Sequence, residues 1–278
     1  MIILSHIQLS AIEKPISAIE ISISPDLNRS YLKVVLSPEG LSFPSGEVLD
    51  WQNIEKIKAD KNGCFLVVNN QAEKIQAFSD RTGQLYSLMP TSAAPTMLIS
   101  GIPMHRIKDT DPWQDTQAKI KAMGKIFGPL LDTNTGLGYT AIAASKFASK
   151  VFTIEIEPTA LDICQKNPWS AGLFSSHNIT SIIGDSFDIV QGVPDEYFNQ
   201  VLHDPPTFAL AGHLYSQEFY ANIFRILKPG GRLFHYIGNP ESKTGSSMTG
   251  GVIRRLRLAG FENITSKQAA FGLLATKR

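Results

Sequence analysis

The stretch from Leu130 to Thr140 reads Leu-Leu-Asp-Thr-Asn-Thr-Gly-Leu-Gly-Tyr-Thr, and it decides the fold. The two leucines predict the end of a buried strand, which Asp132 closes. A tight turn with Gly136 and Gly138 follows, and the next residues have the pattern of a helix. Glycines have no Cβ, so they let backbone N–H groups at a helix N-terminus approach a ligand closely. The stretch therefore predicts a cofactor-binding turn between a strand and a helix.

Two classes of cofactor site use such a turn. A dinucleotide site needs Gly-x-Gly-x-x-Gly/Ala and an acidic residue about 20 positions later. Gly136, Gly138 and Ala141 fit that spacing, and Glu155 lies at the right distance to contact a ribose. An S-adenosylmethionine site needs an acid at the end of the first strand and a second acid at the end of the next strand. The turn alone leaves both classes open.

The composition limits the class of protein further. The chain has 278 residues, 43% of them hydrophobic and 18% charged, so it can bury the core of one large or two ordinary domains. A formal net charge of +1 gives no global field that would recruit nucleic acid or an anionic membrane. Cys64 and Cys164 form no metal-type pair, and no secretion signal or membrane-spanning run is present. We therefore expect a cytoplasmic protein with no membrane partner and no metal.

Residues 1–100 predict a small domain made mainly of β-strands. The β-type runs, which turn residues separate, lie at 16–23, 31–36, 65–69 and 74–78. No catalytic motif lies in this part of the sequence. We therefore expect it to serve in homo-oligomerisation or as one wall of a cleft.

Residues 101–128 predict a connecting loop followed by a helix. Asp111 is the expected N-cap of that helix and Pro112 its first residue, which is the usual order of these residue types. The loop carries His105 and Arg106, which could reach a substrate from there. A solvated loop is the alternative interpretation.

Strands and helices alternate over residues 129–278. Strands are expected at 150–155, 179–183, 201–203, 231–237, 261–266 and 271–276, and helices at 158–165, 214–227 and 252–258, with a short helical piece from 186. This alternation implies a parallel sheet covered by helices, with ligands at the carboxyl ends of the strands. Residues 267–269 are too few for a crossover, so the last two strands must pair antiparallel. The predicted fold is α/β: a Rossmann-like, seven-stranded, mostly parallel sheet with an antiparallel last strand, preceded by the small mainly-β domain.

Four carboxylates are expected along the edge where these strands end. Asp132 and Glu155 close the first two strands, Asp185 follows the third and Asp204 follows the fourth. Glu155 can accept charge-assisted hydrogen bonds from both ribose hydroxyls, and Asp185 can accept one from the exocyclic amine of adenine. Asp204 lies where a transferable methyl group would point. A dehydrogenase would also need a second substrate domain, for which no length remains, so S-adenosylmethionine is favoured over a dinucleotide.

These segments resemble motifs I to IV of class I methyltransferases. The matching segments are residues 132–138, Glu155 with Glu157-Pro158, Gly184-Asp185 and Asp204-Pro205-Pro206. Asn-Pro-Trp-Ser (167–170), Leu-Ala-Gly-x-Leu-Tyr-Ser-x-Glu-Phe-Tyr (210–220) and Gly-Gly-Arg-Leu-Phe-His-Tyr-x-Gly-Asn-Pro (230–240) are similar to a family of predicted, mainly archaeal methyltransferases. That family is itself similar to spermidine synthases. The resemblance covers about residues 96–278.

The resemblance implies S-adenosyl-L-methionine as the cofactor. The residues expected to bind it are Asp132, Thr133, Asn134, Thr135, Gly136, Gly138, Glu155, Ile156, Asp185 and Ser186. Asn134 departs from the pattern, because it replaces the first glycine of the usual motif I. Asparagine tolerates a left-handed backbone better than other non-glycine residues. We therefore expect binding to persist with a slightly altered loop.

Asp204 and Pro205 resemble the start of the Asp/Asn-Pro-Pro-aromatic motif of amino-group methyltransferases. An attacking amine needs its lone pair aimed and its hydrogens held, and the Asp204 carboxylate and Pro205 carbonyl can accept those hydrogens. His203 is a candidate hydrogen-bond partner or base, and Tyr215 is expected to overhang the pocket. Thr207 stands in place of the aromatic residue, which makes a flipped nucleic-acid base a weaker candidate substrate.

The leading hypothesis is an S-adenosylmethionine-dependent methyltransferase that acts on a nitrogen of a small molecule or an RNA. The alternative enzyme is an aminopropyltransferase of the spermidine synthase type, which uses the decarboxylated donor. Its glycine turn would be expected to resemble Gly-Gly-Gly-Asp-Gly, whereas this chain has Asn-Thr-Gly-Leu-Gly. A third hypothesis is a non-catalytic subunit that binds S-adenosylmethionine.

Overall fold

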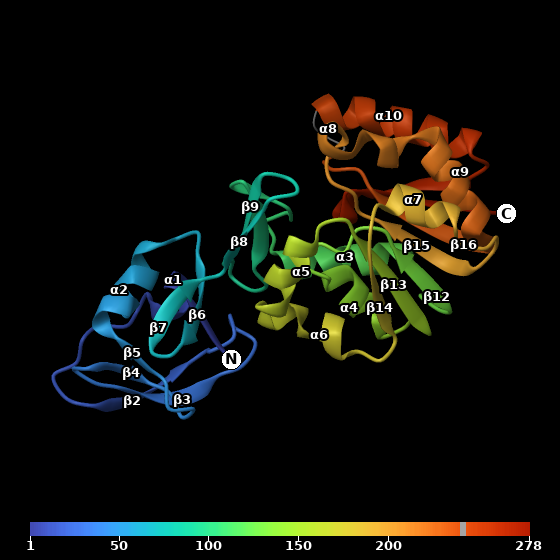
Figure 1. Cartoon of the computed structure of the whole chain (residues 1–278). Coiled ribbons are helices and arrows are strands. Elements are labelled where there is room, and N and C mark those ends of the chain that lie inside the picture. Colours follow the sequence, from blue (N-terminus) through green and yellow to red (C-terminus); the bar gives the residue numbers. More distant parts are fainter. Residues whose placement is uncertain (240–242) are drawn as a thin grey trace. The chain divides into compact units, whose positions relative to one another are not determined.

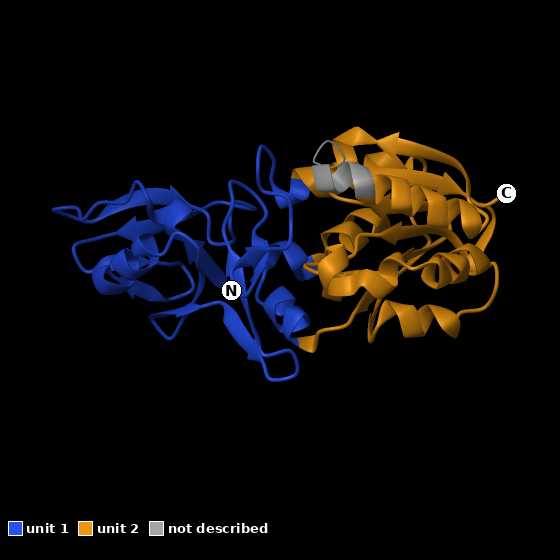
Figure 2. Cartoon of the chain, turned by 90° about the horizontal axis from the view of Figure 1, so that it is seen from above, with its two compact units in different colours: residues 1–113, 159–171 blue, residues 114–158, 172–278 orange. Residues whose placement is uncertain are grey.

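The computed structural model describes residues 1–239 and 243–278, which form two compact units. The first unit comprises residues 1–113 and 159–171, and the second comprises residues 114–158 and 172–278 (Figure 2). Pro240, the last residue of one quoted segment, lies outside the described residues. No described helix is long and apolar enough to cross a membrane. The predicted domain limits, at residues 1–100, 101–128 and 129–278, stay a prediction.

The first unit contains three antiparallel sheets, with strand orders β1-β6-β7, β2-β3-β4-β5 and β11-β10-β9-β8. Their bounds are β1 Ile2–Ser5, β2 Ile19–Ile23, β3 Leu32–Leu36, β4 Gly40–Ser42, β5 Val48–Asp50, β6 Cys64–Val68, β7 Gln71–Lys74, β8 Gln76–Ser79, β9 Gln84–Met89, β10 Thr96–Ile99 and β11 Ile102–Pro103. Two short helices that the sequence did not predict, α1 His6–Leu9 and α2 Trp51–Ala59, accompany them. Asp50 caps α2 by accepting a hydrogen bond from the Asn53 N–H at 2.8 Å. The mainly-β character is confirmed.

Residues 159–171 belong to the first unit although they lie in the middle of the alternating half. Asn167 caps a short 3-10 helix, and its side-chain oxygen accepts from the Trp169 N–H at 3.1 Å. The Trp169 indole N–H donates to the Leu27 carbonyl at 2.9 Å. The Arg29 guanidinium lies 5.9 Å from the centroid of the same indole ring. These contacts give the Asn-Pro-Trp-Ser segment a structural role in the first unit.

The second unit is built on a seven-stranded sheet of order β14-β13-β12-β15-β16-β18-β17. Figure 1 labels its strands β12 to β16. Its strands are β12 Pro129–Asp132, β13 Lys150–Glu155, β14 Ile179–Ile183, β15 Phe198–His203, β16 Leu227–Tyr236, β17 Glu262–Lys267 and β18 Gly272–Thr276. Strands β12 to β16 pair in parallel, and β18 is antiparallel to both β16 and β17. The predicted mostly parallel sheet with an antiparallel last strand is therefore confirmed.

Helices α7, α9 and α10 lie together on one side of this sheet (Figure 1). The remaining elements are α3 Pro112–Met123, α4 Tyr139–Ser145, α5 Pro158–Gln165, η1 Pro168–Ser170, α6 Ala171–Ser175, α7 Ser186–Gln191, α8 Phe208–Ala211, η2 Gly212–Tyr215, α9 Gln217–Ile226, α10 Lys243–Leu258 and η3 Gln268–Ala270. The predicted helix 214–227 begins only at Gln217, because Ser216 caps it by accepting from the Phe219 N–H at 3.0 Å. The sequence did not predict α8 or η2, which carry residues 208–215 past the end of β15.

Candidate active site

The glycine turn after β12 has the open backbone that a cofactor site needs. Gly136 and Gly138 have φ angles of 52° and 76°, in the left-handed region that favours glycine. A Cβ on Gly136 would meet no atom within 4 Å, so open space lies in front of this residue. Asn134 is not among the described residues with positive φ. The left-handed backbone considered for Asn134 is therefore wrong, and the substitution needs no special conformation.

Glu155, at the end of β13, lies directly beside the turn. Its carboxylate accepts hydrogen bonds from the Gly136 N–H at 2.9 Å and the Glu157 N–H at 3.0 Å. Burial raises the pKa of Glu155 from 4.5 to about 7, and these backbone donors only partly oppose that effect. The following residue, Ile156, is 45% exposed and offers apolar surface next to the acid.

Asp185 follows β14 and already has two partners. One oxygen caps α7 by accepting from the Phe187 N–H at 2.8 Å. The other lies 3.0 Å from His213 Nε2. An adenine amine would therefore share this carboxylate with His213, which lies 28 positions further along the chain.

Four other predicted cofactor ligands are buried within the protein: Asp132, Thr133, Thr135 and Ser186. Asp132 accepts hydrogen bonds from the hydroxyls of Thr140 at 2.8 Å and Thr153 at 3.3 Å. Burial and the nearby Asp204 carboxylate raise its pKa from 3.8 to about 7. The Ser186 hydroxyl donates to the Thr133 carbonyl. These buried residues therefore stabilise the glycine turn through hydrogen bonds inside the protein.

Asp204 follows β15 and forms part of a charged cluster with α3. Its Oδ2 lies 2.6 Å from Lys119 Nζ, which also lies 2.8 Å from Asp115 Oδ2. The Lys119 and Asp115 side chains are only 5% and 1% exposed, whereas Asp204 is 20% exposed. Burial raises the pKa of Asp204, and the Lys119 ammonium opposes this. Lys119 was not among the predicted site residues, although its i, i+4 spacing from Asp115 on a helix was a usable signal.

His203 is fully buried, and both of its ring nitrogens have partners inside the protein. Nδ1 lies 2.6 Å from the Thr133 hydroxyl, and Nε2 lies 3.0 Å from the Leu214 carbonyl oxygen. Burial, together with His235, lowers the pKa of His203 well below its ordinary value. The neutral ring connects the glycine turn to η2, and the catalytic role of His203 stays a prediction.

Tyr215 is also buried, and its hydroxyl donates to the Pro206 carbonyl at 2.9 Å. Burial and the Asp204 carboxylate raise the pKa of Tyr215, so its hydroxyl stays protonated near neutral pH. This contact fixes the backbone just after Asp204. Pro205 is buried as well, and the role of its carbonyl stays a prediction.

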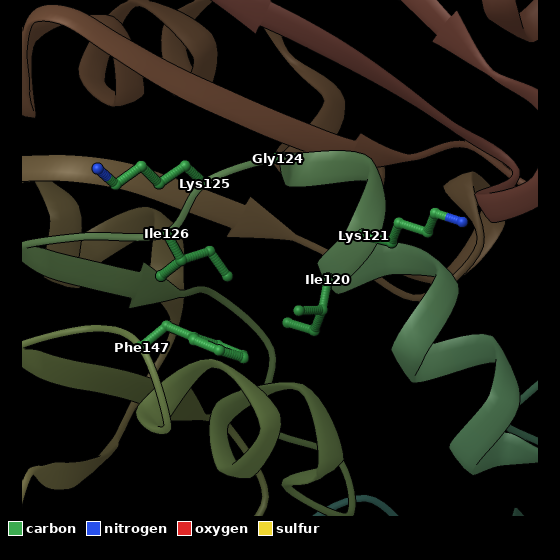
Figure 3. Close-up of a pocket in the computed structure, with 6 residues that line it drawn as sticks. All are labelled: Ile120, Lys121, Gly124, Lys125, Ile126 and Phe147. Atoms are coloured by element: carbon green, nitrogen blue, oxygen red, sulfur yellow. The ribbon is translucent and has the colours of Figure 1, made fainter.

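One surface pocket, of about 390 Å³, has none of the predicted site residues in its lining (Figure 3). Its lining residues are Ile120, Lys121, Gly124, Lys125, Ile126 and Phe147. Its lining has no carboxylate, hydroxyl, thiol or imidazole group, so we assign no chemistry to it. Among the described residues, no group of three His, Cys, Asp or Glu side chains could hold a metal ion. In the first unit, His105 Nδ1 lies 3.0 Å from the Thr96 hydroxyl, and its predicted contact with substrate stays a prediction.

The residues at the sheet edge fit S-adenosylmethionine. The open space before Gly136 can receive the donor, the Glu155 carboxylate borders that space, and Asp185 lies at the end of the adjacent strand. Sheet order and site together define a class I methyltransferase domain.

Comparison with known proteins agrees with this assignment to the class I methyltransferases. A family model described as a methyltransferase domain matches residues 131–235. The chain is 43% identical over 264 residues to the uncharacterized protein MJ1233 of Methanocaldococcus jannaschii, which covers 93% of this chain and 90% of that protein. The chain belongs to the family of this protein. The cofactor of the chain is S-adenosylmethionine.

The similarity to spermidine synthases is also shown. A polyamine aminopropyltransferase of Mycobacterium tuberculosis is 28% identical over 139 residues, which cover 48% of this chain and 26% of that protein. A solved spermidine synthase, in complex with the transition state analogue AdoDATO, has a TM-score of 0.59 at 16% identity. That match covers 77% of this chain and 79% of the other, and it bears on the fold alone.

Proposed function

We propose that the chain transfers the methyl group of S-adenosylmethionine to an amine nitrogen of a small molecule. The observation that carries this proposal is that only one of the two carboxylate oxygens of Asp204 is engaged within the described part of the chain. Lys119 engages Oδ2, whereas Oδ1 has no hydrogen-bond partner in the described part of the chain and the side chain reaches solvent. An acceptor that bears N–H groups complements this free oxygen.

The charge of the cluster also favours an amine over a phosphate-bearing acceptor. Lys119 lies between two carboxylates, and of the three side chains only that of Asp204, at 20%, is appreciably exposed. Such a site attracts an ammonium ion and repels phosphate groups, which makes RNA the weaker candidate.

In this mechanism Asp204 holds an N–H of the acceptor and directs the nitrogen lone pair toward the methyl carbon. The bound cofactor supplies an activated methyl group on a sulfonium ion. The new C–N bond forms as the C–S bond breaks and its electron pair returns to sulfur. The proton released from the nitrogen passes to Asp204 or to water. Tyr215 keeps the backbone after Asp204 in place during transfer.

The alternative reaction is aminopropyl transfer, which the aminopropyltransferase relative and the spermidine synthase fold favour. The free Asp204 oxygen suits an amine acceptor in either reaction, so the donor must separate them. A non-catalytic S-adenosylmethionine-binding subunit is the third candidate.

A labelled-donor assay tests these candidates. The purified chain would be incubated with methyl-labelled S-adenosylmethionine, or with decarboxylated donor labelled in its aminopropyl group. The acceptors would be putrescine, spermidine, n-butylamine and total RNA. Label transfer from S-adenosylmethionine to an amine, lost in Asp204→Asn, is the expected result. Transfer only from the decarboxylated donor, or only to RNA, would overturn the proposal. Binding of S-adenosylhomocysteine without any transfer would favour the third candidate.

A further inference from the structure

Lys119 is a buried cation on the inner side of α3. Its Nζ lies 2.6 Å from Asp204 Oδ2 and 2.8 Å from Asp115 Oδ2, and 4.4 Å from the centroid of the Tyr236 ring. Charge-assisted hydrogen bonds of this length are among the stronger ones in proteins. Contacts on three sides therefore hold the Lys119 ammonium in one place, with one of its partners at the end of β15.

We propose that Lys119 is a positioning residue for Asp204: it holds Oδ2, so that the carboxylate stays ionised with Oδ1 directed to the acceptor. This inference rests on the proposed amine acceptor for its chemical meaning. A carboxylate with both oxygens free could rotate, and if protonated it would present an O–H donor at one oxygen where the acceptor's N–H needs a hydrogen-bond acceptor. The ion pair at a single oxygen removes both possibilities.

The surroundings of Asp204 make such a partner necessary. Burial, the Asp115 carboxylate and the nearby acid Asp132 all disfavour charge on Asp204. Tyr215 faces it with a neutral hydroxyl. Lys119 supplies the opposing positive charge, and its own pKa is above the ordinary value because the two carboxylates outweigh the effect of burial. Asp115 and Lys119 therefore act on Asp204 with opposite signs.

This opposition gives a test that does not need the natural acceptor. The carboxyl titration of Asp204 would be followed by NMR on protein labelled with 13C-aspartate and saturated with S-adenosylhomocysteine. The signal would be assigned from Asp204→Asn. Lys119→Met should raise the apparent pKa of Asp204, Asp115→Asn should lower it, and Lys119→Arg should leave it close to wild type. Lys121→Met, at an exposed position on the same helix, is the matched control and should leave it unchanged.

Activity on the amine found in the labelled-donor assay provides the second measurement. Lys119→Met should lower kcat/KM by roughly 10²-fold, the scale of one positioned acid–base group, with an acidic limb moved to higher pH. Lys119→Arg should recover most of that loss. The double variant with Asp115→Asn and Lys119→Met removes the Asp115 carboxylate together with its Lys119 partner, in case Lys119→Met alone does not fold.

The inference is overturned if Lys119→Met leaves the Asp204 titration and the pH profile as in wild type. It is also overturned if Asp115→Asn and Lys119→Met shift the titration in the same direction. Failure of the proposed function looks different. In that case the NMR shifts follow the expected signs while no amine accepts a methyl group.

Discussion

Glu155→Gln is expected to make the ligand-free protein more stable and the cofactor complex weaker. In the folded protein the Glu155 carboxylate accepts hydrogen bonds from the N–H groups of Gly136 and Glu157, and the residue is half-buried. A glutamine has the same shape and keeps one acceptor oxygen, but it carries no charge. The substitution therefore removes the charge and one of the two backbone hydrogen bonds at unchanged side-chain shape, because the amide nitrogen cannot accept.

The magnitude follows from the pKa. Burial raises the pKa of Glu155 from 4.5 to about 7. Because the pKa of Glu155 is higher in the folded state, protonated Glu155 adds to the free energy of unfolding. This contribution is fully present below pH 4.5 and is lost as the pH rises through 7. Each pKa unit corresponds to about 1.4 kcal/mol, so the ionised carboxylate at pH 8 costs up to about 3 kcal/mol. Glu155→Gln should recover up to that amount at pH 8 and almost none at pH 4.5.

The effect on binding has the opposite sign. Two ribose hydroxyls would donate to the ionised carboxylate, and losing charge-assisted hydrogen bonds costs roughly 2–3 kcal/mol. At pH 8 the variant should therefore bind S-adenosylhomocysteine roughly 30–150-fold more weakly. Below the pKa of about 7, the wild-type affinity should fall by up to about tenfold per pH unit. The variant should lose that part of the pH dependence.

Calorimetry with S-adenosylhomocysteine at pH 6, 7 and 8, and urea unfolding of the ligand-free protein, measure both quantities. Asp188→Asn removes an exposed acid from α7 and serves as the control. If Glu155→Gln binds as tightly as wild type at pH 8, the ribose is held elsewhere. If the variant is instead less stable than wild type at pH 8, the inferred cost of the buried charge is wrong.

Three further predictions concern other parts of the second unit. Asp204→Asn should lower kcat by roughly 10²–10⁴ with little change in S-adenosylhomocysteine affinity; steady-state kinetics and calorimetry would contradict this if binding fell and kcat at saturation did not. Asp185→Ala should weaken that affinity by less than Glu155→Ala does, because a single bond from a neutral amine is weaker; the reverse order by calorimetry would reassign the adenine contact. Arg225→Met should destabilise the protein by about 2–3 kcal/mol, because the guanidinium donates to the Val193 and Val190 carbonyls at 2.6 and 2.8 Å; an unchanged urea midpoint would exclude this.

The fold could be predicted because hydrophobic alternation and strand-end acids are local features of the sequence. The strand Lys150–Glu155 and the helix Pro158–Gln165 have the bounds that their patterns indicated. The antiparallel pairing of β17 and β18 followed from the short connection between them. The α8 helix escaped prediction because its four residues, Phe208–Ala211, are too few to show a helical period.

The site could be predicted only where a residue's neighbours are close in sequence. Gly136 and Glu155 lie on consecutive strand–turn segments, whose adjacency the fold class dictates. Lys119 and Asp204 are 85 positions apart, and His213 and Asp185 are 28 apart. Such pairs arise only when the whole sheet is assembled. The burial of His203 could likewise not be predicted, because the sequence pattern of a histidine at a strand end is the same whether its side chain faces solvent or the core.

The position of residues 159–171 has a consequence for how this protein can be divided and recombined. The backbone passes between the two units three times, after residues 113, 158 and 171. A gene fragment that starts at residue 114 would therefore leave Trp169 without the Leu27 carbonyl to which its indole donates. The first unit therefore cannot be removed as one continuous stretch of sequence. A chimaera that takes the first unit from a relative would have to include residues 159–171 as well as residues 1–113. We accordingly expect insertions and deletions among relatives in the surface turns of either unit, and not at a single boundary between the units.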